Sequence, residues 1–574
     1  MGEMGEMGVL ERLRKIDVVS AVSGEGLHKS TDQAVLEEFA ASGVKFAASE
    51  GSPLERVYYA GVRKLLDCIV PSVSGVPVLH EGGVYLGTWV ESTGTINAEL
   101  LSRFVPSVAQ ATFALFADYQ RSDGLMPYKV TGAGPAYRQI QMVTPLARSV
   151  WNHYRVNGRT DRAFLDKMYR AMERHDAWLA AFRDTRGTGC VEAFCTFDTG
   201  HDLSPRFWHI PDTPHLGDPR RYDPDSPVLP LLAPDLTANV YCQRRYLSDI
   251  AAELGAAAGP EWTAKAAASL SSLMAHCFDA EDGFFYDVDA SGQFVRIQSD
   301  VLLRVLACEV GDGAFFAASL RRYLLNSRKF FAKYPFTSIA MDDPRFDPSS
   351  AYNTWAGTTN FLSLIRTPHV FEHHGRFVEL TWVLQPILSA MVRMERFAQC
   401  LSPWTGEEGF TETYSPAILC LLDYVERLCG ILPTPEEELW FTGLLPYSMD
   451  HGEVPAEETA YARTVDGMSF ELVNTRESST VYRNGERYCR FPYGTRLVTT
   501  RRGEPKALVG MSVRTVEGLL EYEGRAYPVR LGGNEVWRMA GAASGGAEPT
   551  RQAGQAGASA DTLTGPGVVR PTYH

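Results

Sequence analysis

The chain has 574 residues, a formal net charge of −14 and 45% hydrophobic residues. This size and composition are typical of a globular protein with a large core, one large domain and a smaller one. The excess of 69 acidic over 55 basic residues disfavours a nucleic-acid or anionic-membrane partner. No run approaches the ~18–20 apolar residues of a membrane-spanning helix.

Residues 1–50 begin with a polar Met-Gly-Glu repeat and continue into a charged segment. This pattern lacks the apolar region of a secretory signal and predicts a loosely attached N-terminal extension. The 10 cysteines are scattered and form no C-x-x-C pair. We therefore expect reduced, buried thiols in a cytoplasmic protein.

Helical patterns dominate residues 51–455. The first helix is expected to open at Ser52, with Pro53 in its first turn, and residues 106–120 place apolar side chains at three- and four-residue spacing. Further helical patterns cover 139–155, 161–182, 236–254, 261–278, 298–308, 313–325, 351–364, 371–401 and 416–429. Because no fixed repeat period holds, a solenoid is disfavoured, and a bundle or a closed α/α barrel remains.

The pattern changes at about residue 456. Residues 468–474 alternate with period two, and Asn484-Gly485 is a hairpin signal. Residues 456–539 are therefore expected to form a small β-sandwich-like module. Residues 540–574 contain few large apolar groups, which predicts a disordered tail.

Residues 195–206 concentrate chemistry in a turn-like segment. Asp202 lies between His201 and Arg206, and Gly200 with the Ser204-Pro205 pair favours a loop. An aspartate in such a loop also commonly makes capping hydrogen bonds, so the segment alone leaves both interpretations open.

A second acid, Glu412, also precedes a Ser-Pro pair, Ser415-Pro416. Two acids on separate loops are what paired-carboxylate chemistry requires. The separation of 412 − 202 = 210 residues needs an architecture that folds back on itself.

No metal or organic cofactor is expected. In Glu372-His373-His374, adjacent side chains on a helix would face different directions. Residues 287–292 imitate the start of a calcium loop, but Gln298 stands where the bidentate glutamate is needed, so a hairpin is favoured. The chain has neither a phosphate-binding P-loop nor a G-x-S-x-G motif.

Aromatic and amide side chains gather in residues 352–360, a combination that suits polyols because each hydroxyl both donates and accepts hydrogen bonds. Trp89 with Glu91 could likewise stack on and hydrogen-bond a polar ligand, although core packing is the alternative.

From roughly Tyr85 to Gly430, the chain resembles glycoside hydrolase family 63, especially the bacterial branch of mannosylglycerate and glucosylglycerate hydrolases. The segment Gly200-His-Asp-Leu-Ser-Pro-Arg206 is similar to the family's general-acid segment, and Glu412-Thr-Tyr-Ser-Pro416 to its general-base segment. The chain departs from the family pattern at Thr358 and Asn360, which replace a proline and a second tryptophan. No large β-domain precedes the helical region.

The resemblance implies an (α/α)6 barrel over residues 51–455, a mainly α fold with a small C-terminal β-module. It implies an inverting glycosidase for an α-linked glucoside or mannoside, with Asp202 as general acid and Glu412 as general base. It implies these substrate-binding residues: Trp89, Glu91, Gln141, His201, Arg206, Tyr352, Trp355, Gly357, Asn360 and Tyr414.

Two alternatives stay open. Another α/α-barrel sugar enzyme, an epimerase or lyase, would use His201 or His209 as its base. A non-catalytic carbohydrate-binding protein would keep the pocket without the acid–base pair. In every case a carbohydrate is the expected partner; the oligomeric state is not indicated.

Overall fold

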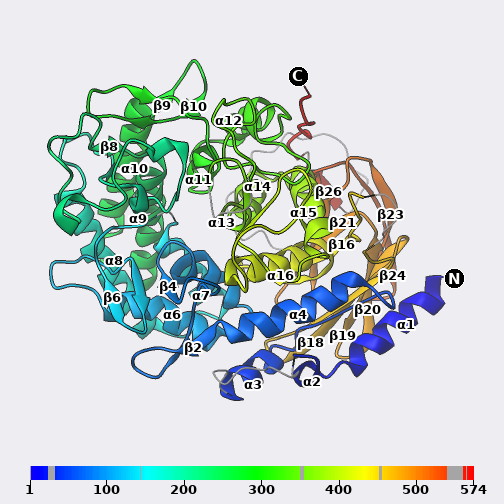
Figure 1. Cartoon of the computed structure of the whole chain (residues 1–574). Coiled ribbons are helices and arrows are strands. Elements are labelled where there is room, and N and C mark those ends of the chain that lie inside the picture. Colours follow the sequence, from blue (N-terminus) through cyan, green and yellow to red (C-terminus); the bar gives the residue numbers. More distant parts are fainter. Residues whose placement is uncertain are drawn as a thin grey trace.

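The computed structural model of the chain describes residues 2–22, 33–142, 144–349, 355–450, 455–539, 560–563 and 565–573. A helical part and two large antiparallel β-sheets lie side by side, and the N-terminal helices lie along the sheets (Figure 1).

The N-terminal segment is anchored on the β-sheets. It comprises α1 (Gly2–Lys15), α2 (Val18–Val22), α3 (Gln33–Ala41) and β1 (Lys45–Ala48). Strand β1 pairs antiparallel with β17 (Thr459–Val465), and the Arg14 guanidinium donates to the Glu471 carboxylate, 2.7 Å from Nη2 to Oε2. The prediction of a loosely attached extension is therefore wrong for these residues.

The helical part contains the α-helices that follow β1. They are α4 (Pro53–Asp67), α5 (Ala98–Leu101), α6 (Pro106–Asp118), α7 (Leu146–Val156), α8 (Arg162–Phe182), α9 (Pro234–Leu254), α10 (Gly259–His276), α11 (Val301–Leu306), α12 (Gly313–Ser319), α13 (Phe361–Leu364), α14 (Thr367–His373), α15 (Phe377–Met391) and α16 (Ser415–Cys429). Five short segments are 3₁₀ or π turns: η1 (Thr93–Asn97), η2 (Thr196–Asp198), η3 (Pro205–Phe207), η4 (His215–Gly217) and η5 (Leu320–Leu324).

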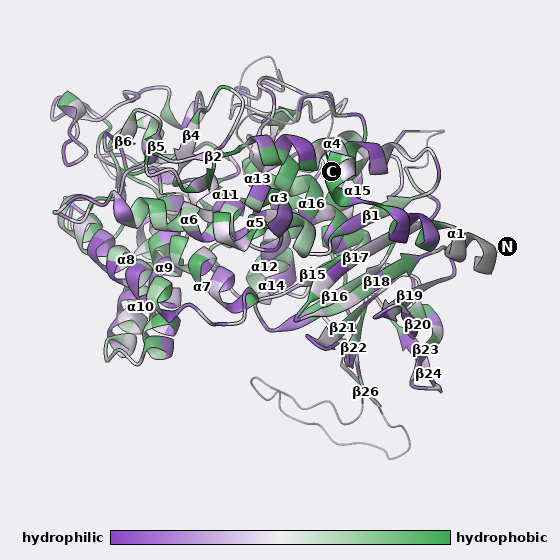
Figure 2. Cartoon of the chain, turned by 90° about the horizontal axis from the view of Figure 1, so that it is seen from below, coloured by the Kyte–Doolittle hydropathy of each residue, from purple (hydrophilic) through white to green (hydrophobic). Residues whose placement is uncertain are grey.

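Burial differs between the helices. Helix α16 is buried over nearly its whole length, whereas α8 and α10 lie at the periphery with hydrophilic residues on their outer side (Figure 2). The Ser52 hydroxyl accepts from the Leu54 N–H and caps α4, as predicted. Among the described residues, no helix combines the length and the apolar character that crossing a bilayer requires.

Short strand pairs lie in the connections between the helices. They are β2 (Ile69–Pro71) with β3 (Pro77–Leu79); β4 (Gly87–Trp89), β5 (Lys129–Thr131) and β6 (Gly134–Ala136); β7 (Glu192–Ala193), β8 (Leu231–Leu232), β11 (Asp287–Val288) and β12 (Phe294–Val295); β9 (Phe278–Asp279) with β10 (Phe284–Phe285); and β13 (Thr359–Asn360) with β14 (Cys400–Leu401). The antiparallel pair β11–β12 is the hairpin predicted in place of a calcium loop.

Two large sheets form the β-part. The seven-stranded sheet has the order β1-β17-β18-β19-β20-β23-β24, with β18 (Met468–Asn474), β19 (Ser478–Arg483), β20 (Glu486–Pro492), β23 (Val516–Tyr522) and β24 (Arg525–Leu531). The six-stranded sheet has the order β15-β16-β21-β22-β25-β26, with β15 (Ile431–Pro433), β16 (Glu438–Gly443), β21 (Thr495–Thr500), β22 (Pro505–Gly510), β25 (Val536–Met539) and β26 (Ala560–Leu563). The predicted Asn484-Gly485 turn joins β19 to β20.

The predicted fold class, a mainly α (α/α)6 barrel with a small β-module, is wrong. About 38% of the chain is helical and 21% lies in strands, including two large sheets, so the fold is mixed α and β. The strand content was underestimated because β15 and β16 precede the expected boundary at residue 456. In addition, β1 comes from the N-terminal segment.

The end of the chain also differs from its prediction. Strand β26 pairs antiparallel with β25, and the Val569 N–H donates to the Glu379 Oε1 on α15 at 2.8 Å. The Thr572 N–H donates to the Leu325 carbonyl at 2.8 Å. Disorder was predicted for the whole of 540–574, and this is wrong for 560–563 and 565–573. Residues 540–559, 564 and 574 lie outside the described residues.

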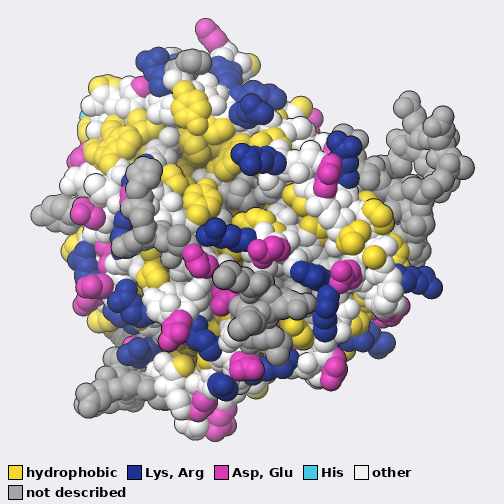
Figure 3. Space-filling view, turned by 90° about the vertical axis from the view of Figure 1, so that its right-hand side faces the viewer, with side chains coloured by type: hydrophobic (Ala, Val, Ile, Leu, Met, Phe, Trp, Pro, Cys, Tyr) yellow, Lys and Arg dark blue, Asp and Glu magenta, His cyan; other side chains and the backbone are white. Residues whose placement is uncertain are grey.

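The face seen in Figure 3 mixes basic and acidic side chains, and hydrophobic side chains gather in its upper part. Tyr447, Met449 and Tyr573 are among the large hydrophobic residues that remain exposed, and they line a cavity of about 610 Å³ near the chain end.

Candidate active site

A buried ion pair anchors the loop that carries Asp202. Arg183 Nη1 lies 2.6 Å from Asp198 Oδ2, and both side chains are fully buried. The Asp198 carboxylate also accepts from the backbone N–H groups of Phe194 at 2.8 Å and Ile140 at 3.0 Å. This one carboxylate therefore joins the Asp202 loop to the loop that carries Gln141.

Glu91 and Gln141 lie against the same loop. Gln141 Nε2 donates to Glu91 Oε2 at 2.8 Å, and that carboxylate lies so close to Gly200 that an added Cβ would overlap with it. Gly200 has a φ of 70°, which also favours glycine. A helical pattern was predicted over 139–155, but α7 begins at Leu146, and Gln141 has a φ of 39° in the preceding loop.

Asp202 itself is partly exposed, and its environment favours the protonated carboxyl. Burial is the main cause that raises its pKa to about 8, and the nearby Glu91 and Glu81 carboxylates add to the effect. Arg304 opposes the shift but does not cancel it. At neutral pH the side chain therefore retains a proton that it can donate.

His201 and Arg206 belong to this loop, and their side chains are buried. Arg206 donates to the Asp287 carboxylate at 2.8 and 2.7 Å and to the Asp235 carboxylate at 3.0 and 3.0 Å. Arg206 Nη1 also lies 2.7 Å from His201 Nδ1, and His201 Nε2 lies 3.0 Å from Asp300 Oδ1. Burial and the charge of Arg304 lower the pKa of His201 to about 3. Both side chains are enclosed by protein partners, which assigns them to the support of the loop.

The segment around Trp355 packs against the Asp202 loop. The Trp355 N–H donates to the Asp202 carbonyl at 3.1 Å, and the buried indole packs on the His201 ring with centroids 4.6 Å apart. Tyr352, expected in the same pocket, lies outside the described residues.

Gly357 and Asn360 have local structural partners. The Gly357 N–H donates to the Ser338 hydroxyl at 2.9 Å, and the Asn360 side-chain oxygen accepts from the Leu362 N–H at 2.9 Å and caps α13. Because that oxygen is used in the cap, the geometry favours a structural role for Asn360.

Glu412 is exposed in the loop that leads into α16. Its backbone carbonyl lies against Gly83, where an added Cβ would overlap with it. The neighbouring Tyr414 hydroxyl donates to Glu81 Oε1 at 2.6 Å, and the Ser415 N–H donates to the Glu81 carbonyl at 2.8 Å. The segment that contains Glu81 therefore holds the Glu412 loop in place.

One segment, residues 80–92, contacts both acid loops. Its Glu91 lies against the Asp202 loop, and its Glu81 binds the Glu412 loop. Between them, the Tyr85 ring lies 5.6 Å from that of Trp89 and 6.0 Å from that of Tyr414, measured between centroids. This segment brings loops 210 residues apart in sequence to one region.

Three contributors were not identified from the sequence. Burial raises the pKa of Glu81 to about 8, which the Tyr414 hydrogen bond opposes. Arg304 Nη1 donates to the Thr199 carbonyl at 2.8 Å, and the Arg304 guanidinium lies 4.8 Å from the centroid of the Trp355 ring. Arg366 is buried near Glu91. Arg304 lies on α11, whereas Glu81 follows β3 and Arg366 lies in the turn between α13 and α14, and no local motif marks any of them.

Solved structures with a fold similar to that of this chain include glycosidases. The chain is 18% identical to the GH63 mannosylglycerate hydrolase from Thermus thermophilus, solved with Tris and D-glycerate, with a TM-score of 0.53 over 64% of this chain and 100% of that chain. The same enzyme with glucose gives 19% identity and a TM-score of 0.52 over 64% and 99%. A sialidase gives 13% identity and a TM-score of 0.60 over 84% and 44%. These likenesses show a shared fold.

A search of curated proteins found no match. Residues 85–415, more than half of the chain, match the family described as the mannosylglycerate hydrolase MGH1-like glycoside hydrolase domain. This range contains Asp202, Glu412 and residues 85–92 of the segment that joins their loops, and it confirms the resemblance drawn from the motifs. The chain belongs to the MGH1-like glycoside hydrolases.

Proposed function

We propose that this protein is an inverting α-glycosidase in which Asp202 is the general acid and Glu412 the general base. The observation that carries the proposal is the state of Asp202. A carboxyl with its pKa raised to about 8 is protonated at neutral pH and can protonate the glycosidic oxygen as the bond to the leaving group breaks.

Glu412 suits the complementary role. It is exposed and lies on a different loop, so its carboxylate can accept a proton from a water molecule that attacks the anomeric carbon. The buried pairs Arg183–Asp198 and Arg206–Asp287 fix the backbone around Asp202, which preorganises the acid before substrate binds.

For the substrate, we propose a small α-linked glucoside or mannoside, such as a sugar joined to glycerate. The family description and the ligands of the Thermus thermophilus enzyme, D-glycerate and glucose, support this class. The partly exposed rings of Trp89 and Tyr85 supply apolar faces of the kind that sugar rings stack on, and the buried Tyr414 ring packs against Tyr85.

The epimerase or lyase alternative is less well supported. It needs a histidine base that reaches substrate. Of its two candidates, the exposed His209 stays available, but His201 is fully buried between Arg206 and Asp300. A side chain so enclosed cannot contact the substrate without opening the ion-pair network.

The test combines product stereochemistry with two conservative variants. Purified protein is incubated with α-glucosylglycerate and α-mannosylglycerate, and the first anomer released is followed by NMR before mutarotation. Release of the β-anomer, with Asp202→Asn and Glu412→Gln each losing ~10²–10⁴-fold in kcat, supports the proposal. First release of the α-anomer would show retention and assign Glu412 a different role. Full activity in both variants would move the active site elsewhere.

We further propose a cytoplasmic location. All 10 cysteines are buried and free, which fits a reducing compartment. Mass spectrometry after alkylation of the unfolded protein without reductant should find every thiol labelled, whereas a reproducible disulfide would contradict this.

A further inference from the structure

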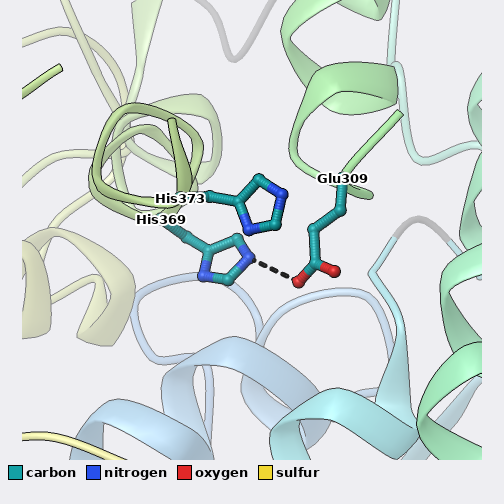
Figure 4. A group of neighbouring side chains, drawn as sticks. All are labelled: Glu309, His369 and His373. Atoms are coloured by element: carbon teal, nitrogen blue, oxygen red, sulfur yellow. Dashed lines mark hydrogen bonds and ion pairs between the residues drawn. The ribbon is translucent and has the colours of Figure 1, made fainter. Parts of the chain in front are cut away.

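A second group of chemically active side chains lies away from the acid loops. Glu309 follows the end of α11, and His369 and His373 lie one helical turn apart on α14 (Figure 4). In Figure 4 both imidazole rings extend from this helix toward the Glu309 carboxylate. Each residue offers one ligand atom, and these atoms all lie within 4.8 Å of one another.

We propose that Glu309, His369 and His373 form a binding site for a divalent first-row transition metal such as Zn²⁺ or Co²⁺. Two imidazoles and one carboxylate are the donor set that this class prefers, whereas Ca²⁺ and Mg²⁺ favour all-oxygen sites. Histidines four residues apart on a helix present their rings on the same face and can bind one ion together.

The positions of the donors need only small adjustments. Zinc bonds of ~2.0–2.1 Å in a tetrahedron place ligand atoms about 3.3 Å apart. His369 Nε2 now lies 2.9 Å from Glu309 Oε1, so this pair must open by a few tenths of an ångström. The widest pair must close from at most 4.8 Å, and exposed His373 has the freedom to move.

Glu309 is already held in position as a ligand. Its Oε2 accepts from Arg245 at 2.6 Å, and its Oε1 accepts from the Tyr246 hydroxyl at 2.7 Å. These two partners orient the carboxylate toward a metal ion.

The residues around the three donors leave space for a metal ion to enter, but they also limit the affinity for it. The three donors line a cavity of about 400 Å³, which leaves room for an ion to enter and for a water molecule in a fourth position. Arg245 Nη1 lies 2.6 Å from Glu309 Oε2 and Arg148 Nη1 lies 3.9 Å from Glu309 Oε1, so positive charge beside this ligand weakens metal binding relative to a site of the same donors alone.

The site is remote from the acid loops. Glu412 precedes the first residue of α16, whereas Arg427, near the other end of this helix, lines the cavity. A helix of 15 residues is about 22 Å long. The metal would therefore link the ends of α11 and α14 without touching the sugar, and this inference stands whether or not the proposed function is correct.

The test uses the full chain without an affinity tag, freed of metal by a chelator and then dialysed. Zn²⁺ binding is measured by equilibrium dialysis, and Co²⁺ binding by the visible absorption of a nitrogen-ligated ion. We expect one equivalent bound by the wild type, and binding weakened at least tenfold in His373→Ala and His369→Ala. The exposed His276, at the end of α10, supplies the control His276→Ala, which should bind like the wild type.

Thermal unfolding adds a second readout. Saturating Zn²⁺ should raise the melting temperature of the wild type and of His276→Ala, but not that of His373→Ala. Because His373 is exposed, its replacement is not expected to unfold the protein. No stoichiometric binding by the wild type, or equal binding by His373→Ala, would overturn the proposal.

Discussion

The Glu91 carboxylate lies directly against Gly200, and the space between them admits no Cβ. This contact joins the segment 80–92 to the loop of Asp202, two residues beyond the glycine. The same carboxylate contributes to the raised pKa of Asp202. One residue, Glu91, therefore helps both to position the proposed acid and to raise its pKa, to which burial contributes most.

Gly200→Ala should disrupt this contact. Gly187→Ala is the matched control, because Gly187 has a similar φ of 65° but open space around its Cα. The left-handed conformation costs ~1–2 kcal/mol in either variant. Only Gly200→Ala should also displace Glu91, so we expect a loss of kcat of at least tenfold there and little loss in Gly187→Ala. Equal activities, measured as initial rates of sugar release, would contradict the inferred contact.

The pH dependence of activity should report the carboxyl of Asp202. A general acid acts only when protonated, so kcat should fall as the pH rises through about 8, the raised pKa of this group. Glu91→Gln removes a neighbouring negative charge and should shift this limb to lower pH. The control is Asp225→Asn. Asp225 is exposed and is not among the residues that shift the pKa of Asp202, so this variant should leave the alkaline limb of the pH profile unchanged. An unshifted limb in Glu91→Gln would exclude this coupling.

Arg206→Met should destabilise the fold. It leaves the buried Asp235 and Asp287 carboxylates without their shared guanidinium, and breaking a buried pair typically costs ~3–5 kcal/mol. Arg221→Met removes an exposed arginine and should cost less than ~1 kcal/mol. Denaturant unfolding measures both variants. A small effect of Arg206→Met would show that the network does not hold the loop.

The C-terminal residues should contribute to stability. Truncation after Leu563 removes the contacts of Val569 and Thr572, and truncation after Met539 removes β26 as well. We therefore expect the melting temperature to fall in two steps, with the larger loss for the shorter chain. An unchanged melting temperature in both would mean that these contacts are energetically neutral.

Local signals in the sequence predicted several elements correctly. Ser52 with Pro53 marks a helix start and the turn at residues 484–485 marks a hairpin, because capping and turn geometry depend on adjacent residues. Strands of two residues carry no periodic signal. The pairing of β1 with β17 joins distant segments and also has no local signature.

In the candidate active site, too, local features could be predicted from the sequence and distant contacts could not. The loop around Asp202 was predicted because Gly200 and the Ser204-Pro205 pair are local markers. The partners of Arg206, which lie 29 and 81 residues further along the chain, could not be identified. From the family resemblance Arg206 was expected to bind substrate, whereas its donors are occupied by protein carboxylates.

The leaving group should distinguish the two proposed catalytic acids. Asp202→Asn keeps the shape of the side chain but cannot donate a carboxylic proton, so hydrolysis of a substrate with a poor leaving group should fall by ~10²–10⁴-fold. Fluoride leaves with little help from a proton. Asp202→Asn should therefore recover much of its activity on the α-glycosyl fluoride of the sugar that the wild type accepts.

Glu412→Gln should show no such recovery, because its defect lies in the activation of water, which every substrate needs. In an inverting enzyme this water stands between the base and the anomeric carbon, which requires carboxyls ~6.5–9.5 Å apart. The ratio of initial rates on the fluoride and the natural glycoside, measured for both variants and the wild type, gives the answer. Equal recovery of both variants on the fluoride would mean that Glu412 does not activate water. If only the proton is missing, Asp202→Asn should recover activity on the fluoride. If the folded variant does not recover, its loss of activity would reflect a displaced loop.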